Sequence, residues 1–209
     1  MDSARIASLL EPFAPGLSAA QLAQLSTYLD LLLRWNARIN LTAVRDPESI
    51  VTRHFGESLF AARRLFPSAD VGVGRAIDLG SGAGFPGLPL KIHAPALRLV
   101  LVESQNKKGA FLNEVVRALD LRDVQVFGGR AEDFPDRAEL VTLRAVERFE
   151  AVLPVAARLA SPAGRLALLI GSPQIPSAQA LLPHFSWSEA VDLPGSAQRV
   201  LLVGTSQGR

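Results

Sequence analysis

Residues 77–87 read Ile77-Asp78-Leu79-Gly80-Ser81-Gly82-Ala83-Gly84-Phe85-Pro86-Gly87. An apolar run ends here in four glycines within eight residues, and a helical pattern follows. Glycine admits positive φ and lets the backbone approach a ligand closely, while the start of a helix offers unpaired N–H groups. A strand-to-helix connection that binds nothing rarely needs so many glycines. We therefore interpret residues 78–87 as a ligand-binding turn between a strand and a helix.

The residues after this turn alternate between short apolar runs and helical stretches, which is typical of βα units that feed a parallel sheet. The predicted strands are residues 76–79, 99–103, 124–127, 140–143 and 165–170. The predicted crossover helices are residues 86–93, 107–119 and 147–159. A terminal β-hairpin is predicted from residues 186–193 and 199–203, with a turn at Pro194-Gly195-Ser196. The predicted fold class is α/β.

The first third of the chain has a helical pattern instead. From Ser18 to Arg38, apolar residues recur at three- and four-residue spacing, and Ser18 is the expected N-cap. Asp46 and Pro47 begin a second helical pattern, which ends near Pro67.

Length limits the number of domains. The chain has 209 residues, enough for one α/β domain with a helical extension and too few for a separate substrate domain. We predict the extension at residues 1–67 and a single compact sheet domain at residues 68–209. Hydrophobic residues make up 48% and charged residues 20%, which excludes a disordered or fibrous class.

Other classes are excluded by what the sequence lacks. There is no cysteine, which rules out disulfides and thiolate chemistry and is compatible with a reducing compartment. The three histidines show no metal-ligand spacing, so no metal is expected. The first eleven residues lack the apolar core of a secretory signal, and no run is long enough to span a membrane. We expect a monomeric, cytoplasmic protein that does not associate with membranes.

Acidic residues near the strand ends indicate which ligand the turn binds. Glu103 follows the second predicted strand, where a carboxylate can accept hydrogen bonds from both hydroxyls of a ribose. Ala131 and Glu132 follow the third strand and could face an adenine edge. Asp78, ahead of Gly80 and Gly82, would attract a cationic ligand and repel a diphosphate. Glu103 and the loop suit either nucleotide cofactor, and the charge of Asp78 favours S-adenosylmethionine.

A second nucleotide is compatible with the same turn. Gly82, Gly84 and Gly87 also satisfy the G-x-G-x-x-G pattern of dinucleotide-binding proteins, and Glu103 serves either ligand. A nicotinamide-nucleotide-dependent oxidoreductase is therefore the alternative. The short chain argues against it, because a dehydrogenase would need a substrate domain with its own acid–base residue.

At this point the sequence resembles a known family, the RsmG (GidB) guanine-N7 methyltransferases of small-subunit ribosomal RNA. The resemblance spans nearly the whole chain. It rests on Trp35-Asn36, Asn40-Leu41-Thr42, Arg53-His54, Ser58-Leu59, residues 78–90, Glu103-Ser104, Lys107-Lys108, Phe111-Leu112, Ala131-Glu132 and Arg144-Ala145.

The resemblance implies a class I (Rossmann-like) methyltransferase sheet with an N-terminal helical extension. It implies methyl transfer from S-adenosylmethionine to N7 of one guanine in small-subunit ribosomal RNA. The family's cofactor-binding positions correspond here to Gly80, Phe85, Glu103, Ala131, Glu132 and Arg144.

Three positions depart from the family pattern. Glu57 replaces an aspartate, Leu143 stands where a serine commonly precedes the arginine, and Ile170 replaces a basic residue. The departures at Leu143 and Ile170 are the support for a third hypothesis, a non-catalytic RNA-binding module that has kept the fold.

Basic residues gather in the helical extension, and we predict that as a group they bind RNA, with Trp35 available for stacking. For any single residue, solvation of a helix face or packing in the core is the simpler interpretation. Lys107 and Lys108 open a helix, where cations are unfavourable relative to the helix dipole, which suggests a phosphate partner. The predicted RNA-binding residues are Arg34, Arg38, Arg45, Arg53, His54, Lys107 and Lys108.

The expected chemistry needs no proton transfer. Neutral guanine carries a lone pair on N7, so catalysis consists mainly of positioning the reacting atoms in line. Arg144 is the one catalytic candidate, because its guanidinium could donate to guanine O6 or to the cofactor's carboxylate. The alternative for Arg144 is an ordinary surface ion pair with Glu132 or Glu147.

Overall fold

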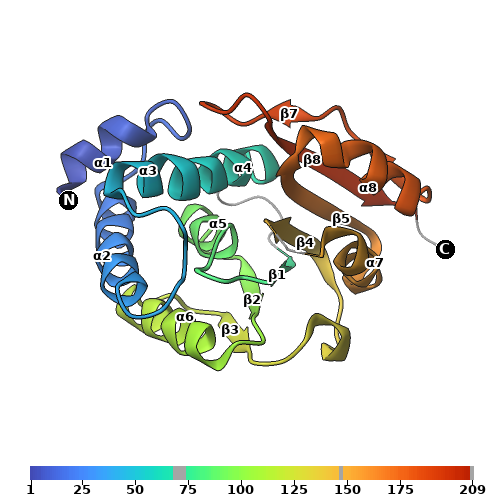
Figure 1. The fold of residues 1–209 in the computed structure, drawn as a ribbon, viewed down its shortest axis with the longest axis horizontal. Helices are drawn as coiled ribbons and strands as arrows, with labels where there is room; N and C mark the ends of the chain where they lie inside the picture. Colours follow the sequence, from blue (N-terminus) through green and yellow to red (C-terminus); the bar gives the residue numbers. More distant parts are fainter. Residues whose placement is uncertain (68–73, 146–147, 208–209) are drawn as a thin grey trace.

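The computed structural model describes residues 1–67, 74–145 and 148–207, and its centre is a mixed sheet with the strand order β3-β2-β1-β4-β5-β8-β6 (Figure 1). β1 to β5 are parallel, and β8 runs antiparallel to β5. The α/β class is confirmed. The strands are β1 (Arg75–Leu79), β2 (Arg98–Val102), β3 (Val124–Phe127), β4 (Ala138–Arg144), β5 (Ala160–Gly171), β6 (Phe185–Trp187), β7 (Val191–Asp192) and β8 (Arg199–Ser206).

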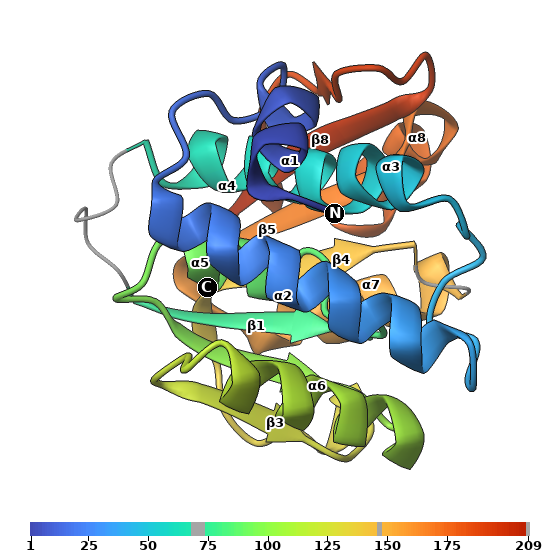
Figure 2. The same cartoon turned by 90° about the vertical axis from the view of Figure 1, so that its left-hand side faces the viewer.

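Helices cover both faces of the sheet (Figures 1 and 2). α7 (Phe149–Leu159) and α8 (Ile175–Leu181) pack on one face. The other face is covered by α2 (Ala19–Asn36), α4 (Glu57–Leu65), α5 (Gly87–His93) and α6 (Asn106–Ala118). α1 (Ser3–Leu10) and α3 (Pro47–Ile50) complete the N-terminal layer. None of the helices in the described ranges is long and apolar enough to cross a membrane.

Burial on both faces explains the apolar runs of the central strands. In β2, Leu99 and Leu101 join the core beneath α2 to α6, whereas Val100 and Val102 join the core beneath α7 and α8. Because successive strand residues point to opposite faces, a continuous apolar run buries one side chain in each core in turn.

The N-terminal helices begin where the sequence predicts. Ser18 caps α2 by accepting a hydrogen bond from the Gln21 backbone N–H at 3.2 Å. Asp46 caps α3 in the same way through the Ser49 N–H at 2.7 Å. Gln21 also donates a side-chain hydrogen bond to the Ile92 carbonyl at 3.2 Å, which joins α2 to the end of α5.

The second helical pattern is not one regular α-helix. A π-helical stretch, η1 (Val51–Gly56), separates α3 from α4. The Gly56 backbone lies against the Phe13 ring, so that a Cβ there would come within 2.8 Å of ring carbon Cγ. Such widened turns are rare and occur often at functional sites. Here the widened turn carries Arg53 and His54.

Some predicted boundaries differ from the observed ones near the C-terminus. The predicted strand over residues 186–193 is two short strands, β6 and β7, which both pair with β8. α8 was not predicted, because its seven residues with an early proline give a weak helical signal. β5 begins earlier than predicted because Ala160 pairs with Ala138 ahead of a register shift. Glu147, the predicted start of α7, and the domain boundary at residues 68–73 lie outside the described ranges.

Candidate active site

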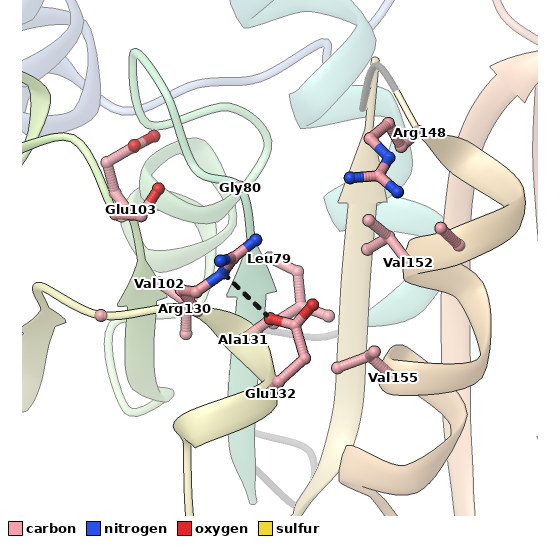
Figure 3. A pocket seen from close by; sticks show the side chains of 13 residues that line it. Leu79, Gly80, Val102, Glu103, Arg130, Ala131, Glu132, Arg148, Val152 and Val155 are labelled. Atoms are coloured by element: carbon pink, nitrogen blue, oxygen red, sulfur yellow. Dashed lines mark ion pairs between the residues drawn. The ribbon is translucent and has the colours of Figure 1, made fainter.

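Two adjoining cavities open at the carboxyl ends of the parallel strands, and both include Gly80 in their walls. The first cavity, of about 250 Å³, lies between the ends of β1 and β2, the loop after β3, and α7 (Figure 3). The second cavity, of about 580 Å³, lies between the glycine-rich turn, η1 and the ends of β4, β5 and β8. Crevices at this edge of open α/β sheets are the usual place for ligands.

Glu103 is held at the mouth of the first cavity with acceptor capacity to spare. Its Oε2 accepts a hydrogen bond from the Gly82 N–H at 3.0 Å, and its Oε1 accepts one from the Gln105 N–H at 2.8 Å. The residue is only 6% exposed. A carboxylate offers about four lone-pair positions, so both oxygens can accept a further hydrogen bond from a ligand.

The walls of the first cavity suit a flat, apolar ring. Val102 stands on one side and Val152 and Val155 of α7 on the other (Figure 3). Ala131 and Glu132 close the edge in the 3-10 turn η2 (Ala131–Asp133). Arg158 holds this turn by donating to the Ala131 and Glu132 carbonyls at 3.3 Å and 2.9 Å.

The glycine-rich turn needs its glycines. Gly80, Gly82 and Gly84 have φ values of 65°, 55° and 89°, in the left-handed region that other residues rarely adopt. At Gly84, a Cβ would also come within 2.5 Å of the Leu88 side chain. From below, the Tyr28 hydroxyl of α2 donates a hydrogen bond to the Ala83 carbonyl. The helical layer and the turn are therefore in direct contact.

Asp78 lies beneath the turn and is fully buried. Its Oδ1 accepts a hydrogen bond from Thr142 Oγ1 at 2.7 Å, and its Oδ2 accepts one from the Gly87 N–H at 3.3 Å. Burial raises the pKa of this carboxyl to about 6. Asp78 is not among the residues that line either cavity. Any attraction of a cationic ligand would therefore act through the turn, and that role stays a prediction.

Arg144 projects from the end of β4 into the second cavity, where three hydrogen-bond acceptors surround its guanidinium. Its Nη2 donates to the Arg53 carbonyl at 2.6 Å, to His54 Nδ1 at 3.1 Å and to Glu57 Oε2 at 3.1 Å. The guanidinium carbon lies 5.8 Å from the centre of the Phe85 ring. Burial is the largest influence on the pKa of Arg144 and lowers it.

Among the described residues, Arg144 does not pair with Glu132. Its partner is Glu57, which is 1% exposed, so the pair is buried. Glu132 instead lies 4.0 Å from Arg130, and Glu147 lies outside the described ranges.

His54 is a neutral link between the helical layer and Arg144. Its Nε2 is 2.7 Å from Thr42 Oγ1, and its ring stacks on Phe85 with centroids 5.0 Å apart. Burial and the neighbouring arginines lower its pKa to about 3. Since Nδ1 accepts from Arg144, the proton is on Nε2 and points to Thr42. Across the described residues, no group of three or more histidines and acids could hold a metal ion.

The predicted RNA-binding residues fall into two sets. Arg53, His54 and Lys108 line the second cavity. The others do not. Arg45 donates to the Asn36 carbonyl at 2.9 Å and to Asn40 Oδ1 at 3.0 Å, Arg34 lies 3.9 Å from Glu114, and Arg38 and Lys107 are exposed.

Trp35 is packed rather than available for stacking. Its Nε1 donates to Glu114 Oε2 at 2.9 Å, and its ring meets Phe111 edge-on at 5.8 Å.

Two polar residues of the second cavity were not predicted from the sequence, and the acid Glu57 was interpreted only as a departure from the family pattern. Arg199 begins β8 and enters the cavity because it pairs with Gly171 across the antiparallel register. Gln174 follows the end of β5. Nothing in the local pattern marks Arg199, because its position depends on how β5 and β8 pair. Gln174 could have been found, because it follows the carboxyl end of a parallel strand. Glu57 is the acid that both Arg144 and Arg199 contact.

The fold and the two cavities define the class of protein, a class I methyltransferase. Solved structures with the same fold include magnesium protoporphyrin IX methyltransferase from Synechocystis with bound SAM, at a TM-score of 0.66 and 14% identity over 91% of this chain and 98% of that one. The ribosomal protein L11 methylase of Lactobacillus delbrueckii gives a TM-score of 0.61 at 14% identity, over 74% and 79% of the two chains.

The family follows from the sequence comparisons. Residues 21–191 match the model of GidB, the rRNA small subunit methyltransferase G family, and the chain belongs to it. Ribosomal RNA small subunit methyltransferase G of Xylella fastidiosa is 42% identical over 81% of this chain and 78% of its own length. The protein of that name from Chloroflexus aggregans is 39% identical over 90% and 83%.

The family resemblance and the cofactor prediction are thereby confirmed. The chain is an S-adenosylmethionine-dependent methyltransferase, and no match described above supports the oxidoreductase alternative.

Proposed function

We propose that this chain transfers a methyl group from S-adenosylmethionine to N7 of one guanine in small-subunit ribosomal RNA. The observation that carries the proposal is the junction of the two cavities at Gly80. One cavity has the acid and apolar walls of a nucleoside site, and the other is lined by arginines. A cofactor and an RNA base can therefore meet at the glycine-rich turn.

The residues of the first cavity fit the nucleoside half of the cofactor. Glu103 would accept the ribose hydroxyls, since its oxygens keep acceptor capacity beyond the two backbone N–H groups. Val102 and Val152 would flank the adenine, with Ala131 and Glu132 at its edge. When bound, S-adenosylmethionine supplies a methyl group on a cationic sulfur.

The amino-acid half would lie along the turn toward the second cavity. Gly80 and Gly82 leave room for it, and Phe85 and Arg144 line the far side. Asp78, beneath the turn, would add a negative field from below. The cofactor would thus be held between the ends of β2 and β4, on either side of the glycine-rich turn.

The second cavity would position the base rather than exchange protons with it. Neutral guanine attacks through its N7 lone pair, so no residue has to remove a proton. His54 fits this expectation, because it is neutral and fully engaged between Thr42 and Arg144. Arg144 is suited to donate to guanine O6 or to the cofactor carboxylate.

Basic residues at and beyond the second cavity would bind the RNA around the target guanine. Arg53 and Lys108 lie at the cavity, and Arg34, Arg38 and Lys107 are exposed beyond it. Arg45 would support the loop instead, through its bonds to Asn36 and Asn40. The proposal includes the ribosomal subunit or its RNA as the partner, a cytoplasmic location, a monomer and no metal.

The test is methyl transfer to small-subunit ribosomal RNA from cells that lack this protein. With labelled cofactor, we expect one labelled guanine that becomes sensitive to chain cleavage after reduction. Methylation at N7 makes the imidazole ring cationic and reducible, whereas methylation at N1, N2 or O6 of guanine does not. Large-subunit RNA is the control. Absence of transfer, or label on another atom or base, would overturn the proposal.

A further inference from the structure

One buried carboxylate holds two guanidinium groups that come from different strands. Glu57 begins α4 and is 1% exposed. Its Oε1 accepts hydrogen bonds from Arg199 Nε at 2.8 Å and Nη2 at 2.6 Å. Its Oε2 accepts from Arg144 Nη2 at 3.1 Å. Two cations in one cavity repel each other, and the carboxylate between them offsets that repulsion.

The two arginines differ in what they leave for a ligand. The Arg144 side chain is 11% exposed, and its Nη2 meets three protein acceptors. The Arg199 side chain is 35% exposed, and its Nη1 has no hydrogen-bond partner among the described residues. Since the guanidinium is planar and one edge is fixed on Glu57, the Nη1 donors lie away from Glu57.

Gln174 adds a second donor to the same wall of the cavity. Its Oε1 accepts a hydrogen bond from the Gly171 N–H at 3.0 Å, which fixes the amide. Its Nε2 has no partner within the described part of the chain, so its donors remain for a ligand.

The charges of this cavity favour an anion. The described residues that line it include the cations Arg53, Lys108, Arg144 and Arg199, and a single acid, Glu57, whose two oxygens already accept three hydrogen bonds. Fixed donors beside this excess of cations suit a phosphate oxygen, for which arginine is the usual partner.

We propose that Glu57 is a positioning residue that aims Arg199 at a backbone phosphate of the RNA, next to the target guanine. The inference rests on the proposed function and adds a substrate contact on β8 and a residue that affects the KM for RNA through that contact. The other bond of Glu57, to Arg144, would affect kcat instead. Glu57 itself touches no RNA in this proposal.

A double-mutant cycle tests it. The variants are Glu57→Gln, Arg199→Gln and both together, with kcat and KM for RNA measured at several salt concentrations. We expect each single variant to raise the KM for RNA about tenfold and the double variant to be no worse than Arg199→Gln, because contacting residues with one shared role are not additive. Losing one phosphate contact should also lower the salt slope of log(1/KM) by about 0.7.

Controls separate this role from a structural one. Glu189→Gln and Arg122→Gln remove charges from exposed residues that line neither cavity, and they should leave KM and slope unchanged. If Glu57→Gln fails to fold, Arg199→Gln and Arg199→Lys still test the phosphate contact, since lysine keeps the charge and therefore the slope.

Two outcomes would overturn the inference while wild-type methyl transfer stands. Multiplying effects of the two single variants would mean that Glu57 does not act through Arg199. An unchanged salt slope in Arg199→Gln would exclude the proposed contact between Arg199 and a phosphate. Failure of the wild-type enzyme to methylate the RNA would instead remove the proposed function.

Discussion

Thr142 Oγ1 donates a hydrogen bond to Asp78 Oδ1 over 2.7 Å, between side chains that face each other on neighbouring strands β4 and β1. Together with the Gly87 N–H, this bond fixes a buried carboxyl directly under the glycine-rich turn. A loss of charge on Asp78 would therefore change the electrostatic potential at the glycine-rich turn.

Asp78 and His54 should have opposite effects on the pH dependence of stability. The pKa of Asp78 is raised to about 6, so the free energy of unfolding falls as pH rises from about 4 to 6. The pKa of His54 is lowered to about 3, so the free energy of unfolding falls as pH drops below 6.5. Between pH 4 and 6, the two effects offset each other in the wild-type protein.

Single variants should expose each effect. Relative to wild type, Asp78→Asn should lose about 1.4 kcal/mol of unfolding free energy per pH unit as pH falls from 6 to 4.5. His54→Gln should show the opposite slope. Urea unfolding at half-unit steps of pH measures both. Curves that run parallel to wild type would contradict the assigned pKa values.

Glu103→Gln should weaken cofactor binding. The amide keeps one acceptor oxygen for a backbone N–H but loses the charge that a ribose hydroxyl would meet. A charge-assisted hydrogen bond contributes on the order of 1.5 kcal/mol, so the Kd for S-adenosylmethionine should rise about tenfold. Calorimetry measures it, with Glu11→Gln on the exposed N-terminal surface as the control. Equal affinities would place the ribose elsewhere.

Arg144→Ala should abolish most methyl transfer and also reduce stability. Within the described ranges, truncation leaves the buried Glu57 with Arg199 as its one ionic partner, and breaking a buried pair costs up to about 3–5 kcal/mol. Arg144→Lys separates the effects, because it keeps the charge but not the planar fork. We expect a kcat about 100-fold below wild type for the lysine variant, as for a misplaced reacting group.

Single-turnover rates and thermal unfolding measure these two effects. The exposed Arg117→Lys on α6 serves as the matched control. A lysine variant with full kcat would exclude Arg144 from the reaction.

Arg38→Glu combined with Arg53→Glu should weaken RNA binding without affecting the cofactor. Both side chains are exposed, and Arg53 also borders the second cavity. We expect at least about a tenfold loss of RNA affinity and a smaller salt slope. The matched control is Arg117→Glu with Arg122→Glu, which makes the same charge change on α6 and before β3. Equal losses in both pairs would indicate net charge rather than a surface.

The sequence was informative where one segment carries the whole signal. The glycine-rich turn, the capping residues Ser18 and Asp46 and the apolar runs of β1 to β4 are local features, and the structure confirms them. Glu103 lines a cavity because the carboxyl ends of parallel strands share one edge, and its contact with a ribose stays a prediction.

The rest depends on pairing that no local pattern shows. Arg199 reaches the second cavity through the antiparallel register of β8 with β5, and Glu57 meets two arginines that are 87 and 142 residues away in sequence. The sequence also could not show that Asp78 is buried, because a residue before a turn can lie under it as easily as in it. Trp35 had the same ambiguity, and packing against Phe111 decided it.

Tyr28 has a consequence for how this chain can be rebuilt. Its hydroxyl bonds the Ala83 carbonyl, and its ring stacks on Phe85 with centroids 5.4 Å apart. Residues 1–67 thus contribute a side chain that packs directly beneath the glycine-rich turn. Chimeras that exchange the first 67 residues between relatives should be active only when the new segment has a tyrosine at the position of Tyr28. If residues 68–209 were expressed alone, the Phe85 ring would lose its packing partner and be exposed to water, and we expect the fragment to aggregate.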